Sequence, residues 1–236
     1  MPANLATHRE RAPLAHPGAT CIDLGHALLV EHHQSDEQIG PCALADLTNL
    51  PRLGLRGKAA AARLAAAGLP IPQAPNRVER APTGELLLRL SQGEYLLLGS
   101  FADRGARVRA LEADLPKAGE DGLYFLPRQD SHAWFWLGGA RRAEVMAKLC
   151  GVDLSAAAFT RDAIAQTSVA RINAIVAADG GGHAETPGGN GDGGGAYHLL
   201  FDRPSAAYFW DALLDAMREF GGGPVGFGVV AAAHGQ

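Results

Sequence analysis

The pattern of hydrophobic and polar positions changes twice along the chain. Residues 1–42 are polar and show no clear period, which predicts an N-terminal extension of loops with one short strand over residues 21–30. Residues 43–220 alternate between strand-like and helix-like stretches separated by glycine and proline, which predicts one folded α+β domain. Residues 221–236 contain a short apolar run and are predicted to form a C-terminal tail.

Two parts of this domain repeat the same order of elements: a strand, a glycine break, a helix, a hairpin and a second helix. The first part is predicted from residues 44–55, 58–67, 85–90, 94–98 and 103–115. The second part is predicted from residues 133–137, 140–150, 163–178, 197–201 and 205–220. The repeat, about residues 45–115 against 130–220, predicts an α+β fold of two fused, pseudo-symmetric strand–helix–hairpin–helix halves.

A glycine-rich stretch interrupts the second half where its hairpin should turn. Residues 180–195 read GGGHAETPGGNGDGGG and contain nine glycines. This stretch has nothing apolar to bury and a high backbone entropy, so we predict a flexible insertion. A tolerated surface loop is the simplest role for it, and a lid or a loop that grips a partner is the functional alternative.

Aromatic residues gather at two places in the second half. Trp134 and Trp136 alternate with Phe135 in a predicted strand, so both faces of that strand are apolar. We predict a central strand covered on both sides, with a protein interface as the alternative. In the last helix, Phe209 and Trp210 point to different sides, so one of them is expected to be free to face a partner.

The composition of the chain argues against several classes of function. Lys and Arg total 21 against 25 Asp and Glu in 236 residues, so the basic excess expected of a nucleic-acid binder is missing. No apolar run is long enough to span a membrane and the N-terminus lacks a secretory pattern, so we expect a soluble, cytoplasmic protein. Three cysteines are too few for a disulfide framework and fit a reducing compartment.

The usual phosphate-binding loops are also missing from the sequence. No Walker sequence occurs. Gly226-Phe227-Gly228 is the nearest approach to a dinucleotide-binding turn, but the apolar run over residues 227–233 is strand-sized and no helix is expected after it. Nucleotide binding by this chain is therefore not predicted.

Five possible metal ligands lie in or beside the N-terminal extension: Cys21, His26, His32, His33 and Cys42. Their spacing matches no zinc knuckle, and the two adjacent histidines would point in different directions on any regular element. We interpret them as loop histidines and small buried cysteines, and we predict no metal site on this chain.

Acid–base and nucleophilic groups form no recognisable catalytic set. Cys150 is predicted near the C-terminus of an apolar helix, which disfavours a thiolate, so we interpret it as a core residue. Asp130, His132 and Asp202 could serve as general acids or bases, but the sequence alone does not bring them together. Polar residues of turns and strand ends are the simpler interpretation. We therefore predict no catalytic residue, and the residues that would bind a cofactor stay unknown.

Seven segments follow one another over about residues 42–220. They are residues 44–57 (LADLTNLPRLGLRG), 68–76, 90–98, 137–142, 149–154, 159–171 and 205–216. In this order they resemble the gamma subunit of heterotetrameric sarcosine oxidase. The first segment also resembles the "A-D-L-S … R-x-x-x-x-G" stretch of folate-binding aminomethyltransferases. The long N-terminal segment before it is similar to the N-terminal segment of the corresponding subunit of N-methylglutamate dehydrogenase.

The resemblance implies an aminomethyltransferase-like fold and a place in a complex. It implies that this chain is a non-catalytic structural subunit of a flavin-dependent heterotetramer that oxidatively demethylates an N-methyl amino acid, sarcosine or N-methylglutamate. The one-carbon unit would pass to tetrahydrofolate on a partner subunit. Alpha, beta and delta subunits would be the partners, and FAD, FMN, NAD, tetrahydrofolate and zinc would lie on them, with no cofactor on this chain.

Two departures from the resemblance keep other functions open. The lead over residues 1–42 and the stretch over residues 180–195 are longer than expected for the sarcosine oxidase subunit. The segment Gln92-Gly93-Glu94 does not supply the catalytic aspartate of the aminomethyltransferases. A stand-alone folate-binding aminomethyl or methylene transferase is the enzyme alternative, and a regulatory binding module is a third reading.

Overall fold

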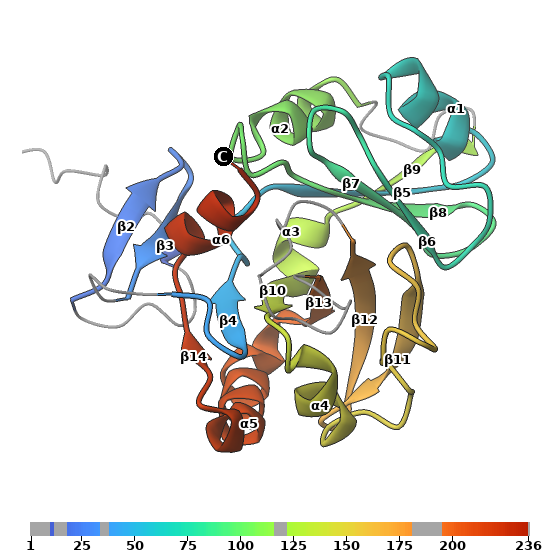
Figure 1. Cartoon of the computed structure of the whole chain (residues 1–236). Coiled ribbons are helices and arrows are strands. Elements are labelled where there is room, and N and C mark those ends of the chain that lie inside the picture. Colours follow the sequence, from blue (N-terminus) through green and yellow to red (C-terminus); the bar gives the residue numbers. More distant parts are fainter. Residues whose placement is uncertain (1–9, 12–17, 34–37, 116–121, 181–194, 236) are drawn as a thin grey trace, which may run out of the picture.

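The computed structural model describes residues 10–11, 18–33, 38–115, 122–180 and 195–235, which form three β-sheets with helices around them (Figure 1). One sheet has six strands in the order β11 (Ile164–Val169), β12 (Ile172–Asp179), β13 (Ala196–Asp202), β10 (His132–Gly138), β4 (Ala43–Asp46) and β14 (Gly223–Pro224). A second sheet has five strands in the order β6 (Arg77–Arg80), β7 (Leu86–Arg89), β8 (Glu94–Leu98), β5 (Arg52–Arg56) and β9 (Tyr124–Leu126). A small sheet near the N-terminus has the order β1 (Glu10–Arg11), β3 (Ala27–His32) and β2 (Thr20–Asp23).

The two large sheets belong to two halves of the same topology. One half runs through β5, α1 (Ala60–Ala66), β6, β7, β8 and α2 (Ala106–Ala113). The other runs through β10, α4 (Arg142–Ala147), β11, β12, β13 and α5 (Ala206–Met217). Each half is preceded by a strand that lies in the other half's sheet: β4 pairs with β10, and β9 pairs with β5. The α+β fold class is therefore confirmed, and each predicted hairpin is a three-stranded meander.

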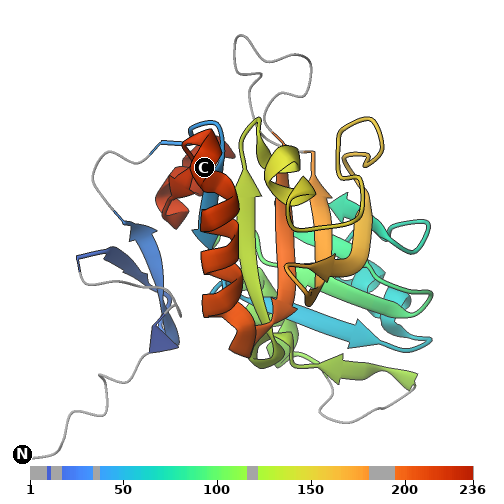
Figure 2. The ribbon, with the colours of Figure 1, turned by 90° about the horizontal axis from the view of Figure 1, so that it is seen from below.

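The two large sheets pack face to face, and helices cover their outer faces (Figure 1); Figure 2 views them from the side of α5. Trp134 and Trp136 point from β10 toward the five-stranded sheet and join a cluster with Leu88 and Leu96. Phe135 points the other way, toward α5. The prediction that this strand is central and covered on both faces is confirmed, because all three aromatic side chains are fully buried. They are core residues of this chain.

The prediction for the aromatic residues of α5 is wrong. Phe209 and Trp210 are both buried, since the ring of Phe209 stacks on Phe201 and the ring of Trp210 meets Phe135 edge-on. The ring of Phe135 lies near both of them, and the ring of His33 lies 6.2 Å from that of Trp210. Their neighbour Tyr208 is the residue that faces outward, with 53% of its surface exposed.

Several connections differ from the pattern-based prediction. Residues 20–32 form two strands rather than one. The stretch over 163–178 is split between β11 and β12 by a tight turn at Ala170 and Arg171, both with positive φ. Strands β12 and β13 pair up to Asp179 opposite Ala196, on either side of the glycine-rich stretch. The predicted flexibility falls mainly on residues 181–194, which lie outside the described residues. No helix in the described ranges is long and apolar enough to cross a membrane.

The C-terminal apolar run forms a helix, α6 (Phe227–Ala233), and not a strand. The prediction that no helix follows the glycine turn at Gly226 and Gly228 is therefore wrong. The structure gives the two glycines another role. A side chain on Gly226 would collide with the carbonyl of Glu31, and one on Gly228 would lie 2.7 Å from the ring of His32. The glycines let α6 lie directly against β3.

We expect the substitution Gly226→Ala to destabilise the chain by about 1–3 kcal/mol, because the new methyl group must push α6 away from β3. Chemical denaturation followed by circular dichroism would measure the change in the free energy of unfolding. Gly40→Ala is the matched control, since a methyl group there meets no atom within 4 Å. Equal stability of the two variants would show that α6 is not seated on β3 as described.

Candidate functional site

Two of the three predicted acid–base groups meet at the start of β10. Strands β10 and β13 pair with His132 directly opposite Asp202. Asp130 lies two residues earlier in the short helix α3 (Arg128–Ser131). His132 and Asp202 line an open pocket of about 550 Å³, together with polar residues of β11 and β12 such as Gln166 and Asn173. This is the place in the described structure where the predicted candidates come closest to a site.

The hydrogen bonds of His132 show that its ring is held neutral. Arg128 donates to Nε2 at 3.3 Å, so Nε2 is an acceptor and the proton is on Nδ1, 2.8 Å from the hydroxyl of Ser131. Burial, together with the charges of Arg128 and Arg52, lowers the pKa of His132 to about 4, although the charge of Asp202 opposes the shift. Both ring nitrogens are occupied, so this histidine is poorly placed to take a proton from a substrate.

We expect His132 to stay neutral down to about pH 4, well below the ordinary histidine value of about 6.5. Its protonation would require the ring to leave Arg128. NMR titration of the imidazole protons, with His132→Asn used for assignment, would measure this. A midpoint near 6.5 would mean that the Arg128 contact does not form in solution and that His132 is free to act as a base.

A buried arginine holds the elements that carry His132. Arg52, on β5, is 1% exposed. Its side-chain nitrogens donate to five carbonyl oxygens, those of Thr48, Leu50, Arg128, Gln129 and His132. Burial lowers its pKa to about 10, against the charges of Asp46 and Asp130, so the guanidinium stays protonated at neutral pH. Arg52 thus joins the loop after β4 to helix α3 and to the start of β10.

A second polar cluster lies deep between the two halves. Asp179, at the end of β12, accepts from His198 at 3.1 Å and forms an ion pair with Arg80 of the five-stranded sheet. His234, directly after α6, places its Nε2 3.2 Å from the same carboxylate. Burial raises the pKa of Asp179, but the hydrogen bonds from both histidines and the charge of Arg80 outweigh it and hold the pKa well below its usual range. The cluster therefore links both large sheets and the C-terminal helix.

The proton positions in this cluster exclude metal binding through His198. The indole N–H of Trp134 can only donate, and it lies 2.9 Å from Nδ1 of His198. The proton of His198 is therefore on Nε2, where it is donated to Asp179, and burial lowers the pKa of the ring. A metal ion on Nε2 would need that nitrogen deprotonated. The cluster is best described as a buried hydrogen-bond network.

The possible metal ligands of the N-terminal region are spread apart. Cys21 is exposed on β2, whereas Cys42 is buried in the core beside α5. Nδ1 of His26 accepts from Arg109, which also donates to the Leu24 carbonyl. Within the described part of the chain, no group of three or more His, Cys, Asp or Glu side chains has the arrangement of a metal site.

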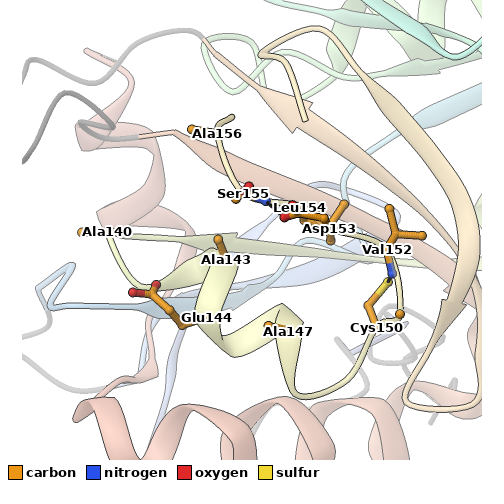
Figure 3. Close-up of a pocket in the computed structure, with 11 residues that line it drawn as sticks. Ala140, Ala143, Glu144, Ala147, Cys150, Val152, Asp153, Leu154, Ser155 and Ala156 are labelled. Atoms are coloured by element: carbon orange, nitrogen blue, oxygen red, sulfur yellow. Dashed lines mark hydrogen bonds between the residues drawn. The ribbon is translucent and has the colours of Figure 1, made fainter. Parts of the chain in front are cut away.

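Cys150 lines a shallow pocket of about 580 Å³ between α4 and the loop that follows it (Figure 3). Cys150 is partly exposed and packs against the hydrophobic core, which fits its interpretation as a core residue. Its neighbours are engaged locally: the sulfur accepts from the backbone of Val152, Asp153 accepts from Ser155, and Glu144 pairs with Arg141. No histidine is among the residues that line this pocket, so no imidazole base is available to the thiol there.

Sequence reasoning missed the two buried polar clusters, one around Arg52 and one around Asp179 and His198. Arg52 was part of the segment that carried the resemblance, but it was not singled out. His198 stands inside an apolar strand (AYHLLF), and Asp179 ends another (IVAAD). A polar residue with apolar neighbours on both sides of a strand must find a buried partner, and that signal could have identified both.

Comparisons with known proteins identify the fold of this chain but do not show which family it belongs to. No protein-family model and no curated protein matches the sequence. Among solved structures, the chain is similar to a chain of the heterotetrameric sarcosine oxidase from Corynebacterium sp. U-96 in complex with pyrrole 2-carboxylate, with a TM-score of 0.57 and 24% identity over 78% of this chain and 88% of that chain. It is also similar to the glycine cleavage system aminomethyltransferase T from Bartonella henselae, with a TM-score of 0.63 and 15% identity. That match covers 92% of this chain but 58% of the aminomethyltransferase. The fold is aminomethyltransferase-like.

Proposed function

We propose that this chain is a non-catalytic structural subunit of a heterotetrameric, flavin-dependent complex that oxidatively demethylates an N-methyl amino acid, sarcosine or N-methylglutamate. The observation that carries the proposal is the extent of the match to sarcosine oxidase, which spans 88% of that chain and 78% of this one. The aminomethyltransferase, by contrast, extends well beyond the part that this chain matches.

Two features of the described structure support the structural role. A ligand between the two large sheets would have to displace Trp134 and Trp136, which fill that space and are fully buried. The candidate base His132 has both ring nitrogens occupied. In this proposal, Trp134, Trp136 and His132 serve the fold rather than a substrate.

In this proposal, the alpha-, beta- and delta-type subunits hold FAD, FMN, NAD, tetrahydrofolate and zinc. The flavin oxidises the N-methyl group, and the one-carbon unit passes to tetrahydrofolate on a partner. This chain holds none of these groups, and we place the complex in the cytoplasm. Its own contribution would be to stabilise the assembly through its surface.

Affinity purification from the native cell would test the proposal. The tagged chain is expected to elute in a complex well above its own 24.6 kDa, with flavin absorbance and with oxidising activity on sarcosine or N-methylglutamate. A colourless 24.6 kDa monomer would contradict the subunit role.

The match to aminomethyltransferase T over 92% of this chain favours a second candidate, a stand-alone folate-binding transferase. Titration calorimetry of the purified chain with tetrahydrofolate separates the two functions. Saturable heat from a colourless monomer would support the transferase, whereas no heat at millimolar ligand would exclude it.

A further inference from the structure

The outer edge of β9 presents aromatic side chains to solvent. Tyr124 is 55% exposed and Phe125 is 37% exposed. Because side chains alternate along a strand, these two residues project to opposite faces of the sheet. Figure 2 shows β9 beyond β5 at the border of the five-stranded sheet. Among the described residues, no strand pairs with its outer side. An apolar surface on both faces of one edge is suited to a partner that adds a strand.

Two of the other three outer edges of the large sheets, those of β6 and β11, are contacted by other segments, and the third is the two-residue strand β14. Residues 162–164 lie along β6, where the backbone of Val78 donates to Asp162 and that of Ile164 donates to Asn76. The edge of β11 is bridged to Cys150. Sheet edges without a partner promote association between chains, and proteins usually cover or charge them. The described part of this chain contacts the edges of β6 and β11, whereas no described strand pairs with the outer side of β9.

The internal symmetry of the fold shows what fits beside β9. Strands β4 and β9 are equivalent, since each precedes one half and pairs with the first strand of the other. On its outer side, β4 is joined by β14, which pairs with it in parallel and is extended by a hydrogen bond from Val225 to Leu44. The corresponding position beside β9 is not filled by any described residue. The fold therefore accommodates a further strand at this place.

The charges next to β9 indicate the chemistry of the added strand. Arg56 is exposed and stands opposite Tyr124 on β5. Lys58 is also exposed, and its side chain lies over Gly122, two residues before β9. The nearby carboxylate of Glu94 is already paired with Arg128. The two exposed cations favour acidic side chains on a segment that binds here.

We propose that β9 is the docking edge for an extended, acidic segment of a partner subunit, which adds a strand to the five-stranded sheet at the position that β14 occupies in the six-stranded sheet. Backbone hydrogen bonds would supply affinity, and Tyr124 and Phe125 would clasp the added strand from both faces. This inference rests on the proposed function, because it assigns the surface through which the subunit joins its complex.

The test is affinity purification of the full-length tagged chain and of its double variant Tyr124→Glu/Phe125→Glu. The variant removes both aromatic rings and adds charge that repels an acidic partner. We expect at least about tenfold less partner protein and flavin per tagged chain. The matched control is Tyr208→Glu, which alters an equally exposed tyrosine on α5 and is expected to retain the wild-type amount. Thermal unfolding of each purified chain checks that it is folded.

Each outcome decides a separate point. A wild-type chain that captures no flavoprotein contradicts the proposed function, and this inference with it. A wild-type complex that the double variant forms equally well overturns the inference alone, as does equal loss with Tyr208→Glu. If the double variant does not fold, Arg56→Glu and hydrogen exchange of the β9 amides take its place. We then expect Arg56→Glu to capture less partner protein than the wild-type chain. We also expect the β9 amides of the wild-type chain to exchange more slowly in the complex than in the isolated chain. Unchanged capture together with unchanged exchange would overturn the inference.

Discussion

Replacing Arg52 by methionine is expected to lower the free energy of unfolding by about 3–5 kcal/mol. Methionine is similar in length and apolar, so it fills much of the space but donates no hydrogen bond. The carbonyl oxygens of Thr48, Leu50, Gln129 and His132 would then lose the buried donor that they share. Each unsatisfied buried acceptor costs about 1–3 kcal/mol of folding free energy. A water molecule that enters the space and donates to the carbonyl oxygens would recover part of this cost. Chemical denaturation at neutral pH measures the loss.

The neighbouring arginine on the same strand provides the control. Arg56 is exposed at the end of β5, so Arg56→Met is expected to change the stability by no more than about 0.5 kcal/mol. Arg52→Lys keeps the charge but has three donors in place of five, and should fall between wild type and Arg52→Met. Equal effects of Arg52→Met and Arg56→Met would show that the five carbonyl contacts contribute nothing to stability.

Strong local patterns allowed about half of the fold to be predicted from the sequence. The alanine-rich helix α1, the hairpin of β7 and β8 and the central position of β10 were each specified by their own residues. Strand β6 was missed because three of its four residues are exposed and Val78 alone faces the core. The run that forms α6 has the same apolar composition as a buried strand, so its period could not decide between the two.

The candidate sites were harder to predict because their residues come from distant parts of the chain. His132 and Asp202 are 70 positions apart and meet through the register of β10 and β13. Asp179, His198 and His234 come from two strands and the C-terminal helix, while Arg80 comes from the other sheet. Local patterns specify elements but not which strand ends become neighbours, and these clusters depend on that pairing.

Replacing Asp179 by asparagine is expected to lower the free energy of unfolding by about 2–4 kcal/mol at neutral pH. The change removes the negative charge that Arg80 faces and one of the acceptors of His198 and His234. The N–H of His198 would face a neutral acceptor in place of the carboxylate, and the partly exposed Arg80 would lose its counter-charge. Because Asp179 joins both large sheets and the residue after α6, the loss should appear in the global transition rather than in local fraying.

The pH dependence identifies the ionised carboxylate as the source of this stability. The pKa of Asp179 is held well below its usual value of about 3.9, so its contribution is present above about pH 4 and falls as the pH drops toward the folded-state pKa. The stability difference between wild type and Asp179→Asn should therefore be constant near neutrality and shrink below about pH 4. Asp162→Asn is the matched control, because Asp162 also pairs with an arginine of β6 but is 57% exposed, and its effect should stay within about 0.5 kcal/mol. A difference for Asp179→Asn that stays the same down to pH 3 would mean that packing, and not the charge of Asp179, holds the two halves and the C-terminal helix together.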